Sequence, residues 1–290
     1  MTLLQRRLGS STLWFCLLAY SVIFILLQRL VFPRLHLPAD AATLASACLA
    51  SFPVLLYGRI QSPWSSRSAA ERPGATALLY LFGLDMTFKL VVSLSTPGLD
   101  SLLRFAGLSA QPAAAPESAF SPILAIYVCL LGPVLEELIY RGVLLSRLRP
   151  YGALFALVLS SICFGLMHHD LYQGLSACLS GLIYGYAALR YSLPAAICLH
   201  IAGNTVSTAL PLLKEAGTAG SLILLCLVFG SFLVALLGTL LLVSRKKKQP
   251  RWLSTQSSPL RPANMLSSPM LWVVILFDTA YTLKASLTLL

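Results

Sequence analysis

Charged residues are scarce in this chain. Asp, Glu, Lys and Arg make up only 11% of its 290 residues, whereas 57% are hydrophobic. A soluble globular domain has about 25% charged residues, so this composition excludes an ordinary soluble fold and places most of the chain in lipid. The sequence also lacks the alternation of polar and apolar residues that is typical of membrane β-barrels. We therefore expect an all-α fold, a polytopic bundle of transmembrane helices.

Several motifs of known enzyme and metal-binding classes are missing. The chain has no Cys-x-x-Cys pair, no Gly-x-Ser-x-Gly elbow of the serine hydrolases and no His-Glu-x-x-His zinc motif. Its seven cysteines all lie within apolar runs, which indicates small packing residues rather than disulfides or zinc ligands. No internal repeat is visible, and this disfavours a transporter built from inverted repeats.

Apolar stretches of about 20 residues, the length that crosses a bilayer, recur along the chain. They predict about eight spans, at residues 12–32, 41–58, 75–95, 120–146, 152–169, 172–189, 193–211 and 219–243. A further apolar stretch, 270–290, contains Asp278 and Lys284 and is either a ninth span or an interfacial helix. The Ser- and Pro-rich segment 249–269 is expected to be a flexible linker. The predicted domains are thus a transmembrane bundle over 1–248, this linker and a C-terminal apolar helix over 270–290.

The net charge of +11 is concentrated at the ends of the apolar stretches. With a cytoplasmic N-terminus, fourteen Lys and Arg residues belong to cytoplasmic segments and four to outside segments, which is the positive-inside bias of membrane proteins. The basic run 245–248 and Arg251 are expected to contact anionic lipid headgroups. No aromatic stacking platform accompanies this charge, so nucleic acid is not an expected partner.

Two adjacent acids, Glu136 and Glu137, lie within an apolar helix. A carboxylate in the bilayer costs about 2.5–3.5 kcal/mol on insertion scales and marks a candidate functional site. Glu137 and Arg141 are four residues apart and are predicted to pair on one helix face. Glu136 points about 100° away and has no partner on its own helix, so it is the stronger functional candidate. Asp85 and Lys89 have the same spacing and are predicted to form a structural ion pair.

Two further motifs place imidazoles in the neighbouring spans. Phe164-x-x-x-His168 lies on the fifth predicted span, at a depth within about 5 Å of that of Glu136, so the two side chains can meet. His200-x-x-x-Asn204 places two polar groups on one face of the seventh span. Measured from the nearest turn, His200 is expected to lie less deep in the bilayer than Glu136.

The three motifs, at 136–141, 164–168 and 200–204, resemble those of the CPBP intramembrane proteases, also called the CAAX-protease or Abi family, which includes the Ras-converting endopeptidases. The likeness covers residues 120–210, and the flanking spans match only in hydropathy. The resemblance implies an eight-helix bundle with a cavity that opens to the cytosolic side. It also implies cleavage of peptide bonds near the membrane surface.

Carried over by motif position, the resemblance implies that Glu136 is the general base and activates a water together with His168. His200 and Asn204 would hold the oxyanion. The resemblance favours catalysis without a metal cofactor. The alternative is a zinc ion held by Glu136, His168 and His200, with the fourth position open.

Three other residues have supporting roles by the same reading. Glu137 and Arg141 would position the helix and the base, and Phe164 belongs to the motif that presents the histidine. The expected activity is that of an intramembrane endopeptidase acting on a membrane-associated peptide or protein. Such a substrate is a prenylated tail, a bacteriocin-like or pheromone peptide, or a segment of a membrane protein, and the sequence does not choose among them.

Two other classes of function remain open. One is a non-catalytic membrane scaffold or immunity protein with the same bundle. The other is a proton-coupled transporter in which Glu136 and His168 relay the proton. In each case the expected location is the plasma membrane of a prokaryote, as an integral membrane protein whose N-terminus is cytoplasmic.

Overall fold

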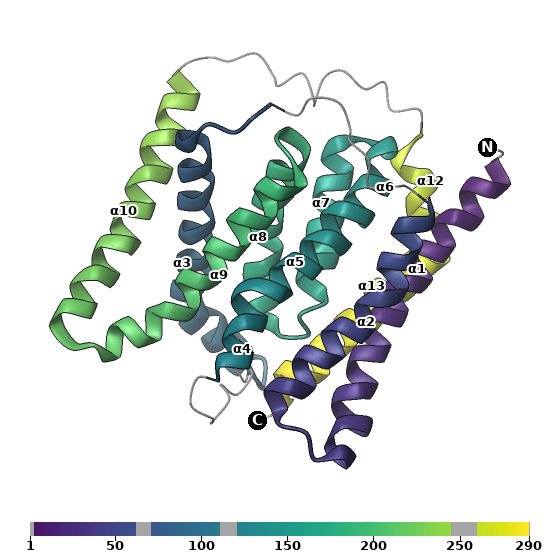
Figure 1. The fold of residues 1–290 in the computed structure, drawn as a ribbon, viewed down its shortest axis with the longest axis horizontal. Helices are drawn as coiled ribbons and strands as arrows, with labels where there is room; N and C mark the ends of the chain where they lie inside the picture. The colour runs from purple at the N-terminus through teal and green to yellow at the C-terminus, as the bar shows by residue number, and fades with distance from the viewer. Residues whose placement is uncertain (1–2, 62–70, 111–120, 245–259, 290) are drawn as a thin grey trace.

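The computed structural model describes residues 3–61, 71–110, 121–244 and 260–289, and it confirms the predicted all-α bundle (Figure 1). The long helices are α1 (Leu3–Leu26), α2 (Ala39–Gln61), α3 (Ala75–Phe105), α7 (Ala153–Leu166), α8 (Leu171–Arg190), α9 (Leu193–Glu215), α10 (Gly217–Ser244) and α13 (Pro269–Ser286). The shorter helices are α4 (Pro122–Ile126), α5 (Gly132–Glu137), α6 (Ser146–Leu148) and α12 (Pro262–Leu266). Two short strands, β1 (Leu108–Ala110) and β2 (Leu287–Leu289), are also present, and short π-helical and 3₁₀ segments join several of the helices.

Within the described residues, six segments are long and apolar enough to cross a membrane: Ser11–Leu35, Ala39–Ile60, Ala75–Phe105, Pro122–Tyr151, Leu193–Glu215 and Gly217–Ser244. The predicted spans 152–169 and 172–189 correspond to α7 and α8. With only 14 residues, α7 is shorter than a full span, and the Gln, Ser, Gly and Tyr residues of α8 lower its hydropathy. These two helices pack against each other in the middle of the bundle (Figure 1).

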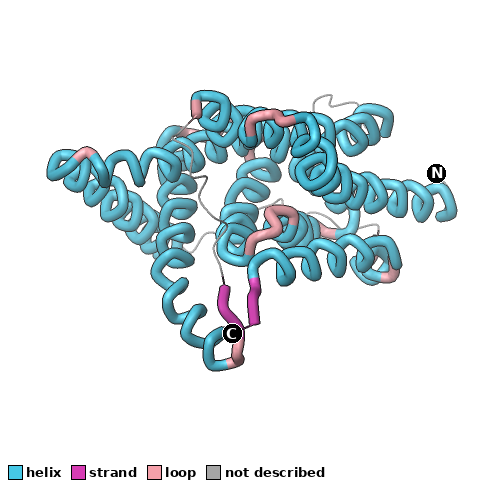
Figure 2. Tube along the Cα trace, turned by 90° about the horizontal axis from the view of Figure 1, so that it is seen from below, coloured by secondary structure: helices cyan, strands magenta, loops and turns pink. Residues whose placement is uncertain are grey.

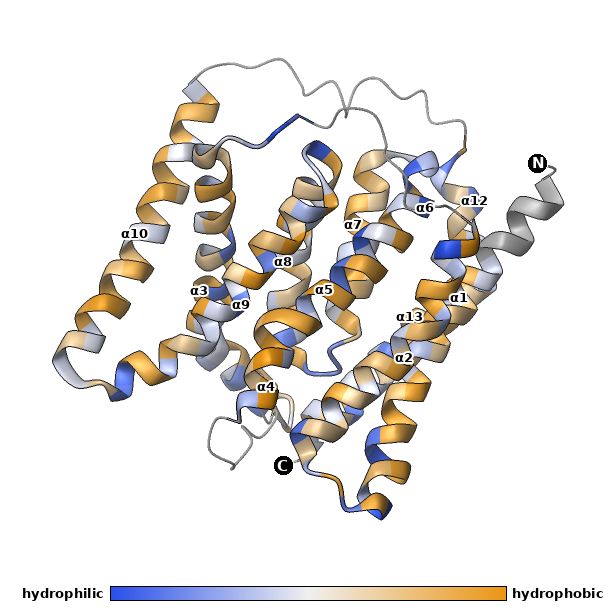
Figure 3. Cartoon of the chain, viewed as in Figure 1, coloured by the Kyte–Doolittle hydropathy of each residue, from blue (hydrophilic) through white to orange (hydrophobic). Residues whose placement is uncertain are grey.

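The outer surface of the bundle is apolar. Figure 3 shows hydrophobic residues along the full length of the helices, most continuously on α10. Only 6% of the most apolar window of α10 is buried inside the protein, and large side chains such as Phe229 and Val243 are exposed. Exposed apolar surface of this extent indicates a lipid interface. The protein is therefore an integral membrane protein.

The segment Pro122–Tyr151 is one continuous helical run with two π-helical stretches, Tyr127–Leu131 and Leu138–Leu145. The first stretch has a clear cause in the sequence. Pro133 has no backbone N–H, and the N–H of Gly132 donates to the carbonyl of Tyr127, five residues back. The carbonyl of Val128 therefore lacks a partner within its own helix.

The C-terminal helices pack against the beginning of the chain. Trp14 is fully buried, and its indole N–H donates to the sulfur of Met265 at 3.3 Å. Strands β1 and β2 pair antiparallel, with Ser109 opposite Thr288, which joins the end of the chain to the end of α3 (Figure 2). The predicted C-terminal apolar helix is α13. Of the predicted linker, residues 249–259 lie outside the described residues, and α12 forms within the remainder.

Candidate active site

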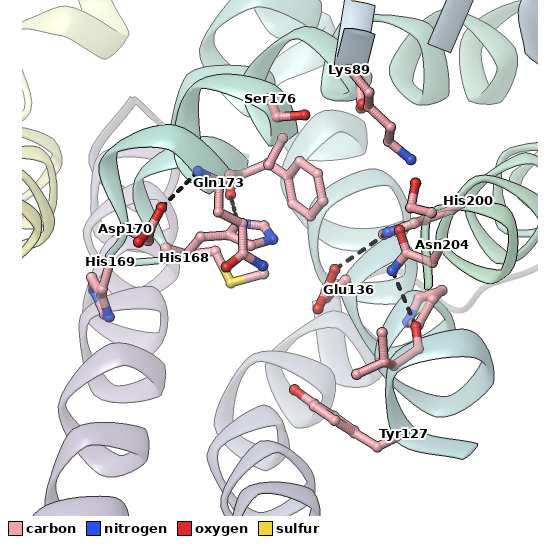
Figure 4. A pocket seen from close by; sticks show the side chains of 18 of the residues that line it. Lys89, Tyr127, Glu136, His168, His169, Asp170, Gln173, Ser176, His200 and Asn204 are labelled. Carbon is pink, nitrogen blue, oxygen red and sulfur yellow. Dashed lines mark hydrogen bonds and ion pairs between the residues drawn. The ribbon is translucent and has the colours of Figure 1, made fainter. Parts of the chain in front are cut away.

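The four predicted catalytic side chains line one cavity of about 1090 Å³. Glu136 comes from α5, His168 from the segment after α7, and His200 and Asn204 from α9. Figure 4 shows the carboxylate of Glu136 between His168 on one side and His200 on the other. Motifs spread over nearly 70 residues of sequence thus meet at one hollow within the bundle.

The predicted ion pair between Glu137 and Arg141 is present. Nη1 of Arg141 lies 3.0 Å from Oε1 of Glu137, and both side chains are fully buried. Nη2 of Arg141 donates to the carbonyl of Gly181 at 3.2 Å, and the guanidinium lies 4.2 Å from the ring centroid of Phe164. Buried charges need opposite charges and hydrogen-bond partners nearby, so this cluster holds α5 against α8.

His200 lies between the two glutamates. Its Nδ1 is 3.0 Å from Oε1 of Glu137, and its Nε2 is 3.7 Å from Oε2 of Glu136. A carboxylate accepts hydrogen bonds, so Nδ1 of His200 carries the proton and donates a hydrogen bond to Glu137. Glu136 thus finds on α9 the partner that its own helix lacks.

The expected difference in depth between Glu136 and His200 does not occur. The prediction assumed an α-helical rise between Glu136 and the turn at Arg149–Tyr151. The stretch Leu138–Leu145 is π-helical instead, and an i→i+5 turn holds more residues than an α-turn. Glu136 consequently lies nearer to that turn, at the level of His200.

His168 is held through one ring nitrogen and leaves the other available. Its Nδ1 lies 2.8 Å from the carbonyl oxygen of Phe164, and a carbonyl can only accept, so Nδ1 is the protonated nitrogen. Nε2 of the neutral ring then has a lone pair for a proton from the cavity. The Phe164 ring lies edge-on to His168 at 5.0 Å and to His200 at 5.7 Å between centroids, which fixes the orientation of both imidazoles.

Asn204 satisfies the carbonyl that the π-helical stretch exposes. Its Nδ2 donates to the carbonyl oxygen of Val128 at 3.1 Å. This bond engages one of the two N–H bonds of the amide and fixes the side chain at the cavity wall. Gly203, the preceding residue, lets the neighbouring helices approach: a Cβ there would lie 2.5 Å from Oδ2 of Asp85.

Sequence reasoning missed a second layer behind His200. The ring of Tyr184 stacks on His200, with centroids 4.6 Å apart, and its hydroxyl donates to Oδ2 of Asp85 at 2.9 Å. The predicted pair between Asp85 and Lys89 is present at 3.0 Å, and Lys89 lines the cavity. The one sign of this contact in the sequence was Asp85, an acid in the third predicted span that needs a partner within the bundle.

The loop after His168 is tied to the C-terminal helix α13. His169 has a left-handed backbone, with φ of 53°, and its Nε2 lies 3.0 Å from Oδ1 of Asp278. The ring of Tyr281 contacts His169 edge-on at 4.8 Å, and the backbone N–H of Leu171 donates to Ser286 at 3.0 Å. The helix that was expected to be a separate apolar segment therefore forms part of the site.

The alternative zinc site would need three ligands that converge on one point. Across the described part of the chain, no three His, Cys, Asp or Glu side chains come close enough together to hold a metal ion. Glu136, His168 and His200 line the cavity without converging on one point, and Nδ1 of His200 is engaged by Glu137. The arrangement does not fit a three-ligand zinc site.

Comparison with known proteins agrees with the motifs. Residues 118–206 match the family model described as type II CAAX prenyl endopeptidase Rce1-like. No curated protein matches the chain, and no solved structure matches it. The matched residues include all three motifs and the four side chains that meet at the cavity. Through this segment, the chain is similar to the CAAX-protease family, the same family that its three motifs resemble.

Proposed function

We propose that the protein is an intramembrane endopeptidase that hydrolyses a peptide bond of a membrane-associated peptide or protein. The family is one of proteases, and its description supports a substrate associated with the membrane. The observation that carries the proposal is the placement of Glu136 between His168 and His200 in a cavity large enough for a peptide segment. A buried structural acid would be enclosed by its partners, whereas the Glu136 side chain is 15% exposed to the cavity.

The proposed reaction needs a water, a base and donors for the oxyanion. A water between Glu136 and Nε2 of His168 gives its proton to Glu136, and its oxygen attacks the carbonyl carbon of the substrate. The negative charge moves to the carbonyl oxygen, which accepts hydrogen bonds from Asn204 and His200. Collapse of the intermediate breaks the C–N bond, and the proton held by Glu136 passes to the leaving amine. A positioned base contributes about 10²–10⁴-fold to such a reaction.

The role of His200 carries a chemical requirement. Its Nδ1–H is engaged by Glu137, so it can donate to an oxyanion only through Nε2. Such a donation needs a ring with a proton on both nitrogens, and Glu137, 3.0 Å from Nδ1, is the carboxylate that balances this charge once Glu136 has taken the proton of the water. The stack on Tyr184 holds the ring in the plane that both contacts need.

The test compares peptides produced in membranes containing the wild-type protein and Glu136→Gln. The amide is similar in size to the carboxylate but is not a base, so we expect the processing of at least one membrane peptide to fall about 10²–10⁴-fold. Glu215→Gln, at the exposed end of α9, is the matched control and should process normally. Identical peptides from wild-type and Glu136→Gln membranes would contradict the protease and favour a scaffold.

We propose that the reaction proceeds without a metal cofactor. The purified protein should then process its substrate at the same rate after treatment with a strong chelator of divalent ions. Complete loss of activity that zinc restores would contradict this proposal. It would also indicate that Glu136, His168 and His200 rearrange into a ligand set.

A further inference from the structure

The imidazole of His200 is held by side chains. His168 and Asn204 each hydrogen-bond to a backbone carbonyl, whereas the ring of His200 hydrogen-bonds to the carboxylate of Glu137. A carbonyl within a helix is fixed by that helix, but a side chain keeps the freedom of its own torsion angles. The orientation of His200 therefore depends on what holds its neighbouring side chains.

Two side chains hold the ring from different sides. Glu137 binds Nδ1 at 3.0 Å, and Glu137 is itself paired with Arg141 at 3.0 Å. The second is Tyr184, whose ring stacks on the face of the imidazole with 4.6 Å between centroids and 20° between planes. Glu137 belongs to the first motif, whereas Tyr184 lies outside all three motifs.

Tyr184 is held in turn by helix α3. Its hydroxyl donates to Oδ2 of Asp85 at 2.9 Å, and Nζ of Lys89 lies 3.0 Å from the same oxygen. Asp85 and Tyr184 are both buried. The pair of Asp85 and Lys89 has the same spacing and the same separation as that of Glu137 and Arg141. Both contacts of the imidazole are thus supported by an ion pair between residues four apart.

The polar atoms of this second cluster also converge on helix α9. A Cβ at Gly203 would lie 2.5 Å from Oδ2 of Asp85. It would lie 2.9 Å from both Nζ of Lys89 and the hydroxyl of Tyr184. Figure 4 shows the amine of Lys89 pointing toward His200. Because position 203 has no side chain, the cluster packs against the turn of α9 that carries both proposed oxyanion donors.

Stability alone does not account for the pair of Asp85 and Lys89. Apolar residues of similar volume are often at least as stabilising as a buried ion pair, because the charges lose their hydration. What the carboxylate adds is a strong acceptor for the hydroxyl of Tyr184, since a hydrogen bond to an ionised group is about twice as strong as one between neutral groups.

We propose that Asp85 is a positioning residue of the reaction. It holds the hydroxyl of Tyr184 and thereby the aromatic face that orients His200, and Lys89 balances its charge. This inference rests on the proposed function. It adds helix α3, which lies outside the residues that match the family model, to the parts of the protein that shape the oxyanion site.

Tyr184→Phe tests this role, because it removes the hydroxyl and keeps the ring. The assay is turnover of the membrane peptide whose processing depends on Glu136. We expect kcat to fall about 10-fold, less than the 10²–10³-fold that loss of an oxyanion donor costs. KM should stay unchanged, because the proposed contact of His200 is to an oxyanion that forms only after the substrate has bound.

The matched control is Tyr186→Phe, which removes a hydroxyl two residues further along α8 and outside the cavity lining. It should leave both kinetic constants unchanged. A normal kcat in Tyr184→Phe would overturn the proposal, because the stacked ring would then need no support from Asp85. A rise in KM with a normal kcat would overturn it as well.

Two double variants separate the hydrogen bond from the charge. Asp85→Leu with Lys89→Met removes both charges and the acceptor. Asp85→Asn with Lys89→Met also removes both charges but keeps a carbonyl oxygen that can accept from Tyr184. Neither variant leaves an unpaired buried charge, so both should fold, which thermal unfolding checks.

The first double variant should lower kcat about as far as Tyr184→Phe does. The second should recover most of that loss, because the hydroxyl again has an acceptor. Equal turnover of the two double variants, whether high or low, would overturn the proposal.

Failure of this inference can be told apart from failure of the proposed function. If Glu136→Gln membranes process every peptide normally, the proposed function fails and this inference fails with it. If processing depends on Glu136 but Tyr184→Phe and both double variants have normal turnover, only the role of Asp85 is contradicted, and the protease proposal stands.

Discussion

At the scale of single residues, the site obeys one rule. His168, His200 and Asn204 each use one hydrogen-bonding atom to bind a fixed group of the protein. In the same order, these groups are the carbonyl of Phe164, the carboxylate of Glu137 and the carbonyl of Val128. Each presents a second polar group to the cavity. This division fixes geometry before a substrate arrives, which is what electrostatic stabilisation of a transition state requires.

The motif residues and the Glu137–Arg141 pair could be predicted from the sequence, but the groups that hold His168, His200 and Asn204 in place could not. Spacing of four placed Glu137 beside Arg141, and His200 on the same face as Asn204. The hydrogen bond from Asn204 to Val128 depends on a carbonyl that is exposed only by a π-helical stretch, and that stretch has no periodic signature. The contact of Tyr184 with His200 could not be predicted either, because a tyrosine in an apolar helix usually packs in the core.

Asn204→Ala tests the proposed oxyanion donor. Loss of one such donor lowers turnover by about 10²–10³-fold, and the Val128 carbonyl loses its partner at a cost of about 1–3 kcal/mol. We expect turnover of the peptide identified with Glu136→Gln to fall far more than thermal stability. Ser207→Ala, one turn further along the cavity wall with its hydroxyl bonded within its own helix, should retain activity. A folded Asn204→Ala protein with full activity would contradict the role.

At the scale of elements, the helix that carries Glu136 is shaped by its π-helical stretches. A long apolar stretch predicted a helix over 120–146, and a helical run occupies Pro122–Tyr151. Periodicity could not show that two parts of this run have i→i+5 bonds. These stretches decide the rotation and depth of Glu136, and they are why it meets His200. Two of the predicted spans, α7 and α8, fall below the other six in length or in hydropathy, because central helices need less apolar surface than helices facing lipid.

Pro133→Ala tests this element. The alanine restores a backbone N–H, so the helix can return to i→i+4 hydrogen bonds. The turn then holds one residue fewer, and this change rotates the remainder of the helix by about 100°. A shift of about 1 Å in a catalytic group can cost about 10²-fold in rate. We expect turnover to fall while thermal stability is unchanged or higher, because the proline no longer interrupts the helix.

The matched control is Pro97→Ala, which removes an exposed proline inside α3. It should raise stability without changing turnover. Equal turnover of Pro133→Ala and wild type would mean that the π-helical stretch is not what aims Glu136.

At the scale of the whole molecule, the site extends beyond the segment that matches the family. Residues 118–206 supply the four motif side chains, but the cavity walls also come from α1, α3, α10 and α13. The sequence predicted the bundle and the meeting of the motifs. It could not show that α13 contacts the loop after His168, since neither hydropathy nor spacing links residues more than 100 positions apart.

Asp278→Ala tests the contribution of α13. The substitution removes the buried partner of His169, whose left-handed backbone depends on its surroundings. We expect a loss of about 1–3 kcal/mol in the free energy of unfolding. Faster proteolysis or hydrogen exchange of residues 166–171 should accompany a lower turnover, because His168 begins this loop. Lys284→Ala, exposed on the same helix, should change stability by less than about 0.5 kcal/mol. If Asp278→Ala destabilised the protein while exchange in the loop and turnover stayed normal, α13 would be a structural support that does not position His168.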